Sequence, residues 1–145
     1  MEINSNAVLK TKREIEIHAP IEIVWKVHTD INKWSDWHPD IKHSCIVENP
    51  SVGTVFDWTS DGYKLKSQIQ MFDENRVIGW IGSGFGASAI HIWEFSSLEN
   101  GNTLVLTKES MDGWLVKLFK GMMNNKLNKS LENWLNALKK QSELK

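Results

Sequence analysis

Residues 112–141 read DGWLVKLFKGMMNNKLNKSLENWLNALKKQ and form the longest periodic segment of the chain. Apolar side chains recur along this segment at steps of three and four residues: Leu115, Leu118, Phe119, Met122, Met123, Leu127, Leu131, Trp134, Leu135 and Leu138. The spacing predicts one helix, roughly 42 Å long, with a continuous apolar stripe and with Ser110 or Asp112 as its N-cap. A helix with one apolar stripe needs a partner surface in water, and the rest of the chain is expected to supply it.

The segments before this helix have the patterns of strands and short helices. Alternation and turn residues predict a strand at 8–18, short helices at 21–30 and 31–37, and strands at 41–48, 53–59, 63–73, 76–81, 87–96 and 103–111. Tight turns such as Asp61-Gly62 join neighbouring strands in antiparallel order. A sheet with one face to bury and a helix with one stripe to bury can cover each other, so the sequence predicts an α+β fold in a single domain, residues 1–145.

The composition limits the kinds of partner that we expect. The chain has 145 residues and a net charge of −1, with acidic and basic residues interspersed, so neither nucleic acid nor an anionic membrane surface is indicated. No run is long enough for a transmembrane helix and residues 1–10 lack the apolar core of a signal peptide, so we expect no integral membrane contact and a cytoplasmic location. The single Cys45 excludes an internal disulfide and is consistent with a reducing compartment.

Four segments carry a resemblance to a known superfamily: IEIHAPIEIVWKVHTDINKWSDWHPDI at 15–41, RVIGW at 76–80, HIWEF at 91–95 and GNTLVLTKES at 101–110. With the order of elements, they make the chain resemble the START-related (SRPBCC) helix-grip superfamily, and within it the polyketide cyclase/dehydrase-like branch. The resemblance implies a curved antiparallel sheet of about six to seven strands wrapped around a long C-terminal helix, with two short helices after the first strand. It also implies a deep, mostly apolar cavity between sheet and helix.

Members of this superfamily include lipid carriers, hormone receptors, cyclases and chaperone activators, so the fold alone does not select a function. The leading expectation is a protein that binds a small hydrophobic molecule (lipid, aromatic or polyketide-like) in the cavity, without a cofactor. One alternative is a polyketide cyclase/dehydratase-type enzyme that uses the same cavity. Another is a protein-interaction module of the chaperone-activator type. The sequence leaves catalysis and the oligomeric state open.

Aromatic and sulfur-containing side chains are the candidates for the cavity wall. The chain has eight tryptophans and one tyrosine. Tryptophan suits such a wall because it combines a large apolar ring with one polar N–H group. The candidates are Trp34 and Trp37 at the rim, Trp58, Trp80 and Trp93 on three strands, and Phe119, Met122 and Met123 on the helix. Plain core packing is the alternative interpretation of each.

His91 and Glu109 are the polar candidates, for ligand binding and for catalysis. His91 shares a strand face with Trp93, and Glu109 lies on the next strand. A connecting loop with an odd number of residues places Glu109 opposite His91, whereas a two-residue Asn100-Gly101 turn places Ser110 there. The resemblance favours the register in which Glu109 faces inward. Such a pair could orient a ligand or relay a proton, or it could be a structural ion pair.

Two other patterns are not interpreted as sites. DWHPDIKH at 36–43 has no recognised metal-ligand spacing, so we read it as a solvated loop and predict no metal. GFGASA at 84–89 matches the letters of a dinucleotide fingerprint, but that fingerprint requires a following helix, and 87–95 has the pattern of a strand. We therefore predict a flexible hairpin loop, which could cover the cavity, and no cofactor.

Overall fold

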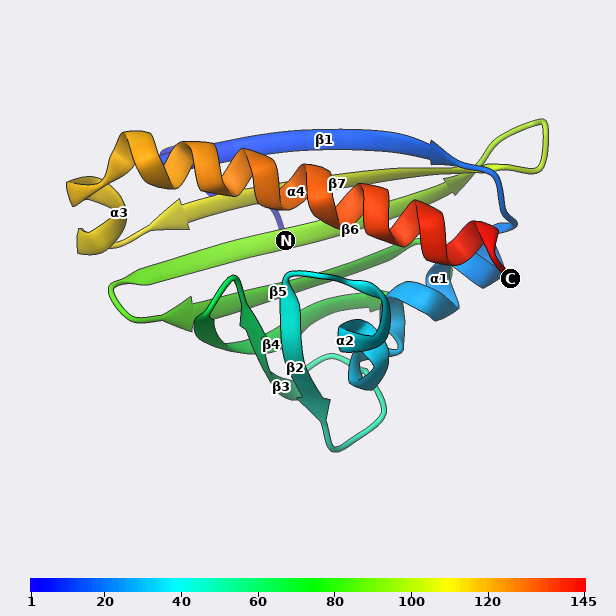
Figure 1. Cartoon of the computed structure of the whole chain (residues 1–145), viewed down its shortest axis with the longest axis horizontal. Coiled ribbons are helices and arrows are strands. Elements are labelled where there is room, and N and C mark those ends of the chain that lie inside the picture. The colour runs from blue at the N-terminus through cyan, green and yellow to red at the C-terminus, as the bar shows by residue number, and fades with distance from the viewer.

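The computed structural model describes residues 1–145 and contains a seven-stranded sheet, a long C-terminal helix and several short helices (Figure 1). The elements are β1 (Leu9–Ile17), α1 (Ile21–Thr29), the 3₁₀ turn η1 (Ile31–Lys33), α2 (Trp34–Trp37), β2 (Ile41–Ile46), β3 (Val55–Ser60), β4 (Tyr63–Asp73), β5 (Val77–Gly84), β6 (Ala87–Ser97), β7 (Thr103–Asp112), α3 (Trp114–Leu118) and α4 (Lys120–Glu143). None of the helices is both long enough and apolar enough to cross a membrane.

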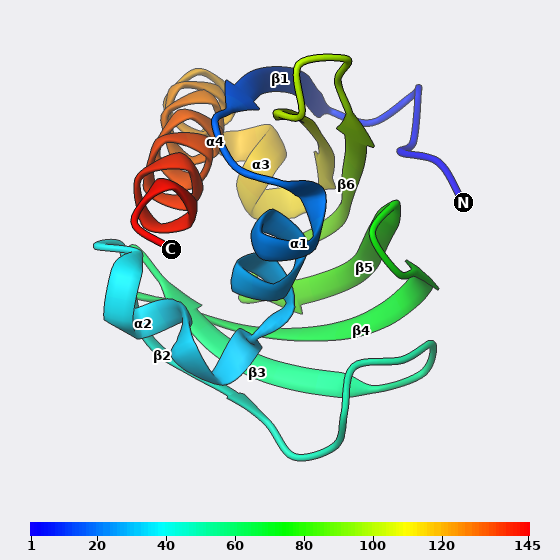
Figure 2. The same ribbon diagram turned by 90° about the vertical axis from the view of Figure 1, so that its right-hand side faces the viewer.

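The sheet is antiparallel, with strand order β1-β7-β6-β5-β4-β3-β2. Every neighbouring pair is consecutive in sequence except β1 and β7. The β3–β4 connection has two residues, Asp61 at φ 50° and Gly62 at φ 84°, and two positive φ angles are what a tight hairpin turn requires. The sheet curves around α4, with α1 at one end of the enclosed space (Figure 2). The predicted helix-grip arrangement is therefore confirmed.

The C-terminal helix differs from the prediction in its first part. The chain leaves helical geometry at Phe119, where φ is −117° and ψ is 40°, so a five-residue α3 precedes the 24-residue α4. Neither expected side chain caps the helix. The Ser110 hydroxyl accepts a hydrogen bond from the Asn4 backbone N–H, and the Asp112 carboxylate accepts one from the Val8 backbone N–H. These polar groups hold the N-terminal segment, which sequence spacing alone did not indicate.

Gly113 makes this sharp entry into α3 possible. Its φ is 125°, a conformation that side chains rarely adopt, and a Cβ atom here would overlap the carbonyl oxygen of Gly86 in the β5–β6 turn. The same carbonyl accepts a hydrogen bond from the Leu115 backbone N–H at 3.0 Å. As a result α3 is held against the β5–β6 turn, and the apolar stripe is not continuous: Leu118, Phe119 and Met122 are exposed.

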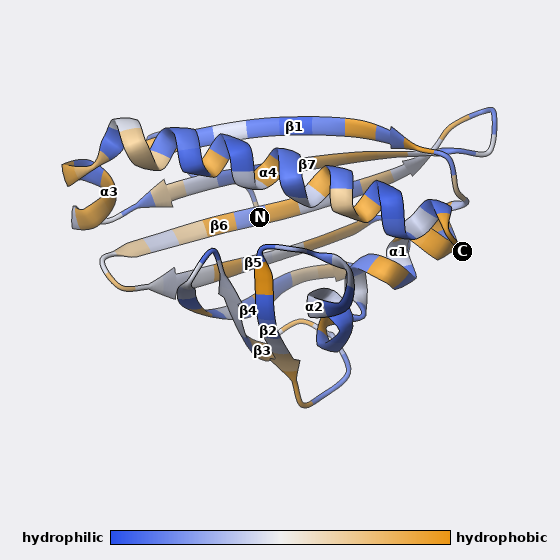
Figure 3. Ribbon diagram, viewed as in Figure 1, coloured by the Kyte–Doolittle hydropathy of each residue, from blue (hydrophilic) through white to orange (hydrophobic).

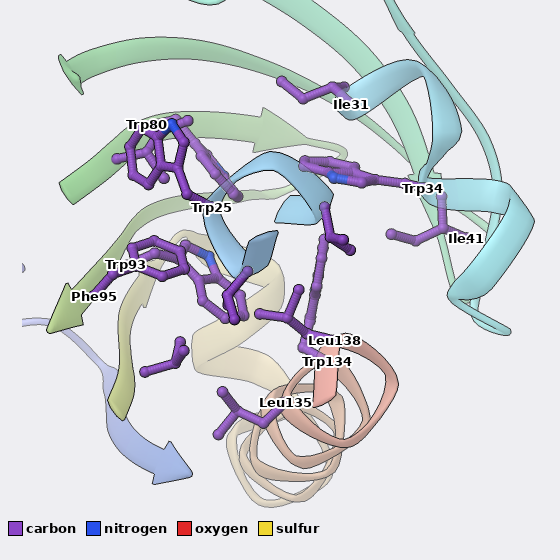
Figure 4. Packing of buried hydrophobic residues seen from close by; sticks show 14 of the residues in the cluster. Trp25, Ile31, Trp34, Ile41, Trp80, Trp93, Phe95, Trp134, Leu135 and Leu138 are labelled. Carbon is purple, nitrogen blue, oxygen red and sulfur yellow. The ribbon is translucent and has the colours of Figure 1, made fainter. Parts of the chain in front are cut away.

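Most tryptophans fill the space between the sheet and α4. In Figure 4, Trp34 comes from α2, Trp80 and Trp93 come from the sheet, and Trp134 comes from α4. The rings of Trp34 and Trp134 meet edge to face with centroids 4.9 Å apart, and Trp93 lies 5.3 Å from Trp134. The Trp34 indole N–H donates to the His28 carbonyl oxygen at 2.7 Å, which satisfies its one polar atom. These indoles close the end of the interior that lies next to α1.

Candidate functional site

A hollow of about 150 Å³ remains between the sheet and the first half of α4. Its wall is partly aromatic, its inner side holds two ionisable groups, and its rim joins the β3–β4 turn, the β5–β6 turn and α4. The wall includes Trp58, Trp80 and Trp134, and the inner side holds His91 and Glu109. Helix α4 also contributes Met123 and Ser130. The residues toward the rim include Asp61, Tyr63, Phe85, Leu115 and Lys126. The buried indoles described above limit how deep this hollow is.

The aromatic wall consists of three indoles from three different elements. Trp58 lies 6.4 Å from Trp80 and 6.1 Å from Trp134, measured between ring centroids. The Trp58 N–H donates to the Ser67 hydroxyl at 3.0 Å, so this indole presents a hydrogen-bonded polar atom to the sheet and an apolar ring to the hollow. All three indoles are buried. The arrangement offers flat apolar surface to a ligand.

The polar pair of the hollow is His91 on β6 and Glu109 on β7. The two residues lie directly opposite each other, because the connection between the strands, residues 98–102, has an odd number of residues. The His91 Nδ1 and Glu109 Oε1 atoms are 3.2 Å apart, and His91 Nε2 is 2.8 Å from the Thr107 hydroxyl. The structure thus adopts the register that the family resemblance favoured, and both ring nitrogens of His91 have a partner.

Burial controls the protonation of this pair. It raises the pKa of the Glu109 carboxyl and lowers the pKa of the His91 imidazole, because each charged form would lose its hydration. A protonated Glu109 can donate to His91 Nδ1 while His91 Nε2–H donates to Thr107. Moving that proton from Glu109 to His91 leaves the pair with the same proton count and the same zero net charge. At neutral pH the inner side of the hollow therefore holds one shared proton.

His28 on α1 is a third buried ionisable group, and it does not line the hollow. Its imidazole is enclosed by aromatic rings, with Trp93 at 4.5 Å and Phe95 at 5.4 Å between centroids, and neither ring nitrogen has a hydrogen-bond partner in the protein. Burial, with a smaller contribution from nearby His91, lowers the pKa of His28 to about 3. His28 is therefore a neutral part of the aromatic core.

The structure brings half of the predicted site residues to the hollow. Trp58, Trp80, His91, Glu109 and Met123 line it, whereas Trp34, Trp37, Trp93, Phe119 and Met122 do not. The sequence interpretation missed Trp134, Ser130 and Lys126 as lining residues. A signal for them existed, because Met123, Lys126, Ser130 and Trp134 follow one another at steps of three and four and so share a helix face.

Two of the residues outside the hollow are core and three are at the surface or half-buried. Trp34 and Trp93 are fully buried among other aromatic rings. Trp37 is half-buried beside Trp134, with 6.0 Å between centroids. Phe119, where the helix breaks, and Met122, on the side of α4 away from buried Met123, are exposed.

The rim carries a contact between α4 and the β3–β4 turn. The Lys126 ammonium lies 3.8 Å from the Asp61 carboxylate and 5.4 Å from the centroid of the Tyr63 ring. Both groups are well exposed, so the ion pair is weak and can open at little free-energy cost. This contact joins α4 to the β3–β4 turn at the rim of the hollow.

The 36–43 segment is not the solvated loop that we predicted, because it comprises the end of α2, a short connection and the start of β2. In the 36–43 segment, His38 is buried with its ring 4.5 Å from Trp134, while His43 is exposed, so the two imidazoles do not converge. Nowhere in the chain do three or more His, Cys, Asp or Glu side chains gather in a metal-binding geometry. The glycine-rich segment forms the β5–β6 turn and is followed by a strand.

Comparisons with known proteins agree with the fold. The model of a family described as polyketide cyclase / dehydrase and lipid transport matches residues 8–143. No curated protein shows significant sequence similarity to the chain. A hypothetical protein from Helicobacter pylori superposes with a TM-score of 0.84 at 19% identity, covering 95% of this chain and 90% of that one.

Two further solved structures bear family descriptions. A START superfamily protein from Mycobacterium smegmatis has a TM-score of 0.81 at 16% identity, covering 93% of this chain and 97% of the other. An aromatase/cyclase from a Streptomyces species also has a TM-score of 0.81, at 17% identity, covering 93% of each chain. At these identities the structural similarity establishes the fold and leaves the function to the site.

Proposed function

The chain belongs to the family of polyketide cyclases, dehydrases and lipid transport proteins, and on that premise we propose that it binds a small hydrophobic molecule with one polar group in the hollow. The observation that carries the proposal is that the His91–Glu109 pair lines the same hollow as Trp58, Trp80 and Trp134, with the Trp80 ring centroid 5.0 Å from that of His91. Apolar burial of the ligand supplies the affinity, at about 25 cal/mol per Å² removed from water. The polar pair orients the ligand.

The size and charge of the hollow define the class of ligand. A space of about 150 Å³ accommodates one aromatic ring or a short acyl segment. A larger lipid or polyketide-like molecule requires the rim to open where Lys126 meets Asp61. Because the His91–Glu109 pair is net neutral and buried, it favours a hydroxyl or carbonyl group and disfavours an anionic one.

Native mass spectrometry tests this proposal. The protein is purified gently from its own host, weighed under native conditions, and then denatured so that any bound molecule is extracted and identified. A discrete apolar molecule with a hydroxyl or carbonyl group is expected. Calorimetry then compares the affinities of phenol and benzene for protein stripped of ligand. Tighter binding of phenol would show that its hydroxyl group adds affinity.

A matched pair of variants ties any binding to the hollow. Ser130→Phe places a ring in the hollow from α4, whereas Asn136→Phe adds the same ring at an exposed position of the same helix. Ser130→Phe is expected to lose the ligand, and Asn136→Phe is expected to keep it. If both variants bind phenol as the unmodified protein does, the hollow is not the site and the proposal is wrong.

The His91–Glu109 pair also favours a second candidate function, an acid–base enzyme of the cyclase or dehydratase type. The pair holds a transferable proton next to apolar space, which is the requirement for proton transfer to an enclosed substrate. The double variant His91→Ala, Glu109→Ala separates the two functions. An enzyme would convert the co-purified molecule and lose that conversion in the variant, while a binding protein would release the molecule unchanged in both forms.

A further inference from the structure

An unusual share of the exposed apolar side chains lies at one end of the molecule. Five of them, Phe85, Trp114, Leu118, Phe119 and Met122, come from the β5–β6 turn, α3 and the first turn of α4; we call this set the apolar end patch. In Figure 1 the β5–β6 turn and α3 lie at the same end, and Figure 3 shows α3 as mainly hydrophobic.

The members of the patch are in contact or are neighbours along the helices. The rings of Phe85 and Trp114 meet edge to face at 5.3 Å between centroids. Trp114 and Leu118 are four residues apart on α3, so they share a face. Their exposed fractions are 78% for Phe85, 57% for Trp114 and 66% for Leu118, which is unfavourable in water for side chains of this size. A partner surface would cover them.

The charges around the patch indicate the kind of partner. Between Gly113 and Leu131 the chain has no acidic residue and four exposed lysines: Lys117, Lys120, Lys126 and Lys129. Of the acids nearby, Asp61 is the partner of Lys126, and Asp112 accepts hydrogen bonds from Asn4 and Val8. The near-neutral total charge of the chain therefore conceals a local positive excess.

The patch adjoins the rim of the hollow. Phe85 belongs both to the patch and to the lining, and Leu115, next to Trp114, also lines the hollow. A surface that covers the patch would consequently face the entrance to the interior.

We propose that the apolar end patch and its lysines dock this protein on the surface of a bilayer that contains anionic lipids. Trp114, Leu118, Phe119 and Met122 insert at the level of the headgroups and upper acyl chains, where aromatic and aliphatic side chains are favourable. The lysines attract the anionic headgroups, each strengthening binding by severalfold. The contact is peripheral. Docking would bring the entrance of the hollow to the membrane, but it depends on the surface alone and not on the function proposed above.

Vesicle co-sedimentation tests the docking without any ligand of the hollow. The probes are phosphatidylcholine vesicles and vesicles in which about 30% of that lipid is replaced by phosphatidylglycerol. Binding is expected to the anionic vesicles, to weaken with added salt, and to be much weaker with phosphatidylcholine alone. No binding to the anionic vesicles at low salt would overturn the proposal.

Two pairs of variants locate the binding surface. Leu118→Ser with Met122→Ser, and separately Lys117→Glu with Lys120→Glu, are each expected to reduce anionic-vesicle binding roughly tenfold or more. The matched controls lie elsewhere on the surface: Val47→Ser with Val52→Ser, and Lys12→Glu with Lys42→Glu. All the changed side chains are exposed, and circular dichroism checks that each variant is folded. Equal losses in the patch variants and their controls would refute the assignment.

Acyl-chain-brominated phosphatidylglycerol gives an independent test, because bromine quenches only those indoles that reach the hydrocarbon. Trp114 is the exposed tryptophan of the chain, so quenching is expected in the unmodified protein and is expected to disappear in Trp114→Phe. A second copy of the chain is the competing occupant of the patch. A dimer in sedimentation velocity that Leu118→Ser with Met122→Ser dissociates, together with no vesicle binding, would assign the patch to self-association and overturn the proposal.

Discussion

Replacing Glu109 by glutamine is expected to remove a loss of stability that we predict for the unmodified protein at alkaline pH. The reason is the shared proton of the His91–Glu109 pair. Burial raises the pKa of Glu109 from 4.5 to about 8 and lowers the pKa of His91 from 6.5 to about 3. The unfolded chain has the ordinary pKa values, so its Glu109 loses a proton near pH 4.5 and its His91 near pH 6.5.

The sign of the effect follows from the proton count in each state. Between pH 4.5 and 6.5 the folded pair and the unfolded pair each hold one proton, so together they add no pH dependence. Between pH 6.5 and 8 the folded pair still holds its proton and the unfolded pair has released it. Stability therefore falls as pH rises, by about 1.4 kcal/mol per pH unit, or about 2 kcal/mol across this window.

Urea unfolding, followed by tryptophan fluorescence, measures the free energy of unfolding at pH 6.5 and at about pH 9. The unmodified protein should lose about 2 kcal/mol between the two, and Glu109→Gln, which does not titrate and whose amide can still donate to His91 Nδ1, should lose almost none. Glu99→Gln, at an exposed position of the β6–β7 loop, is the control and should behave as the unmodified protein. A Glu109→Gln variant with an undiminished alkaline loss would refute the shared-proton account.

Three further predictions concern stability and use the same urea assay. Gly113→Ala should lower the free energy of unfolding by at least about 2 kcal/mol, because alanine is strained at φ 125° and its Cβ overlaps the Gly86 carbonyl oxygen. Gly101→Ala is the control, since φ is also positive there but the surrounding space is open. Equal losses in the two variants would contradict the steric contribution of the Gly86 contact. Ser67→Ala should cost about 1–3 kcal/mol by leaving the buried Trp58 N–H without its acceptor, and no change would mean that another group accepts it. Trp134→Ala should cost about 3–5 kcal/mol, and a cost below about 1 kcal/mol would show that the aromatic core is loosely packed.

The elements were largely predictable because they depend on local periodicity. Alternating apolar residues place the strands, Asp61-Gly62 marks the hairpin, and steps of three and four residues place α4. The break at Phe119 was not predictable from that pattern, because the apolar spacing continues through it. It arises from the positive φ of Gly113 and the close approach of α3 to the β5–β6 turn, both of which are tertiary constraints.

The candidate site was predictable in its residue types and only partly in its members. Alternation on β6 placed His91 and Trp93 on one face, but the register against β7 depended on whether the connecting loop had an odd or even number of residues, which the turn signal Asn100-Gly101 did not resolve. Trp58 and Trp93 have the same inward pattern on their strands. Only the positions of α1 and α4 determine that Trp58 lines the hollow and Trp93 is enclosed by other rings.

The sequence by itself determined the order of the elements, the shared face of His91 and Trp93 on β6, and the supply of indoles for the interior. The tertiary structure decided which indoles line the hollow and which are enclosed in the core. It also decided that Glu109 faces His91, and that lysines and apolar side chains of α3 and α4 lie together at one end of the molecule. The physical reason is that periodicity is a property of neighbours along the chain, whereas cavities, shifted pKa values and surface patches depend on distances between residues remote in sequence.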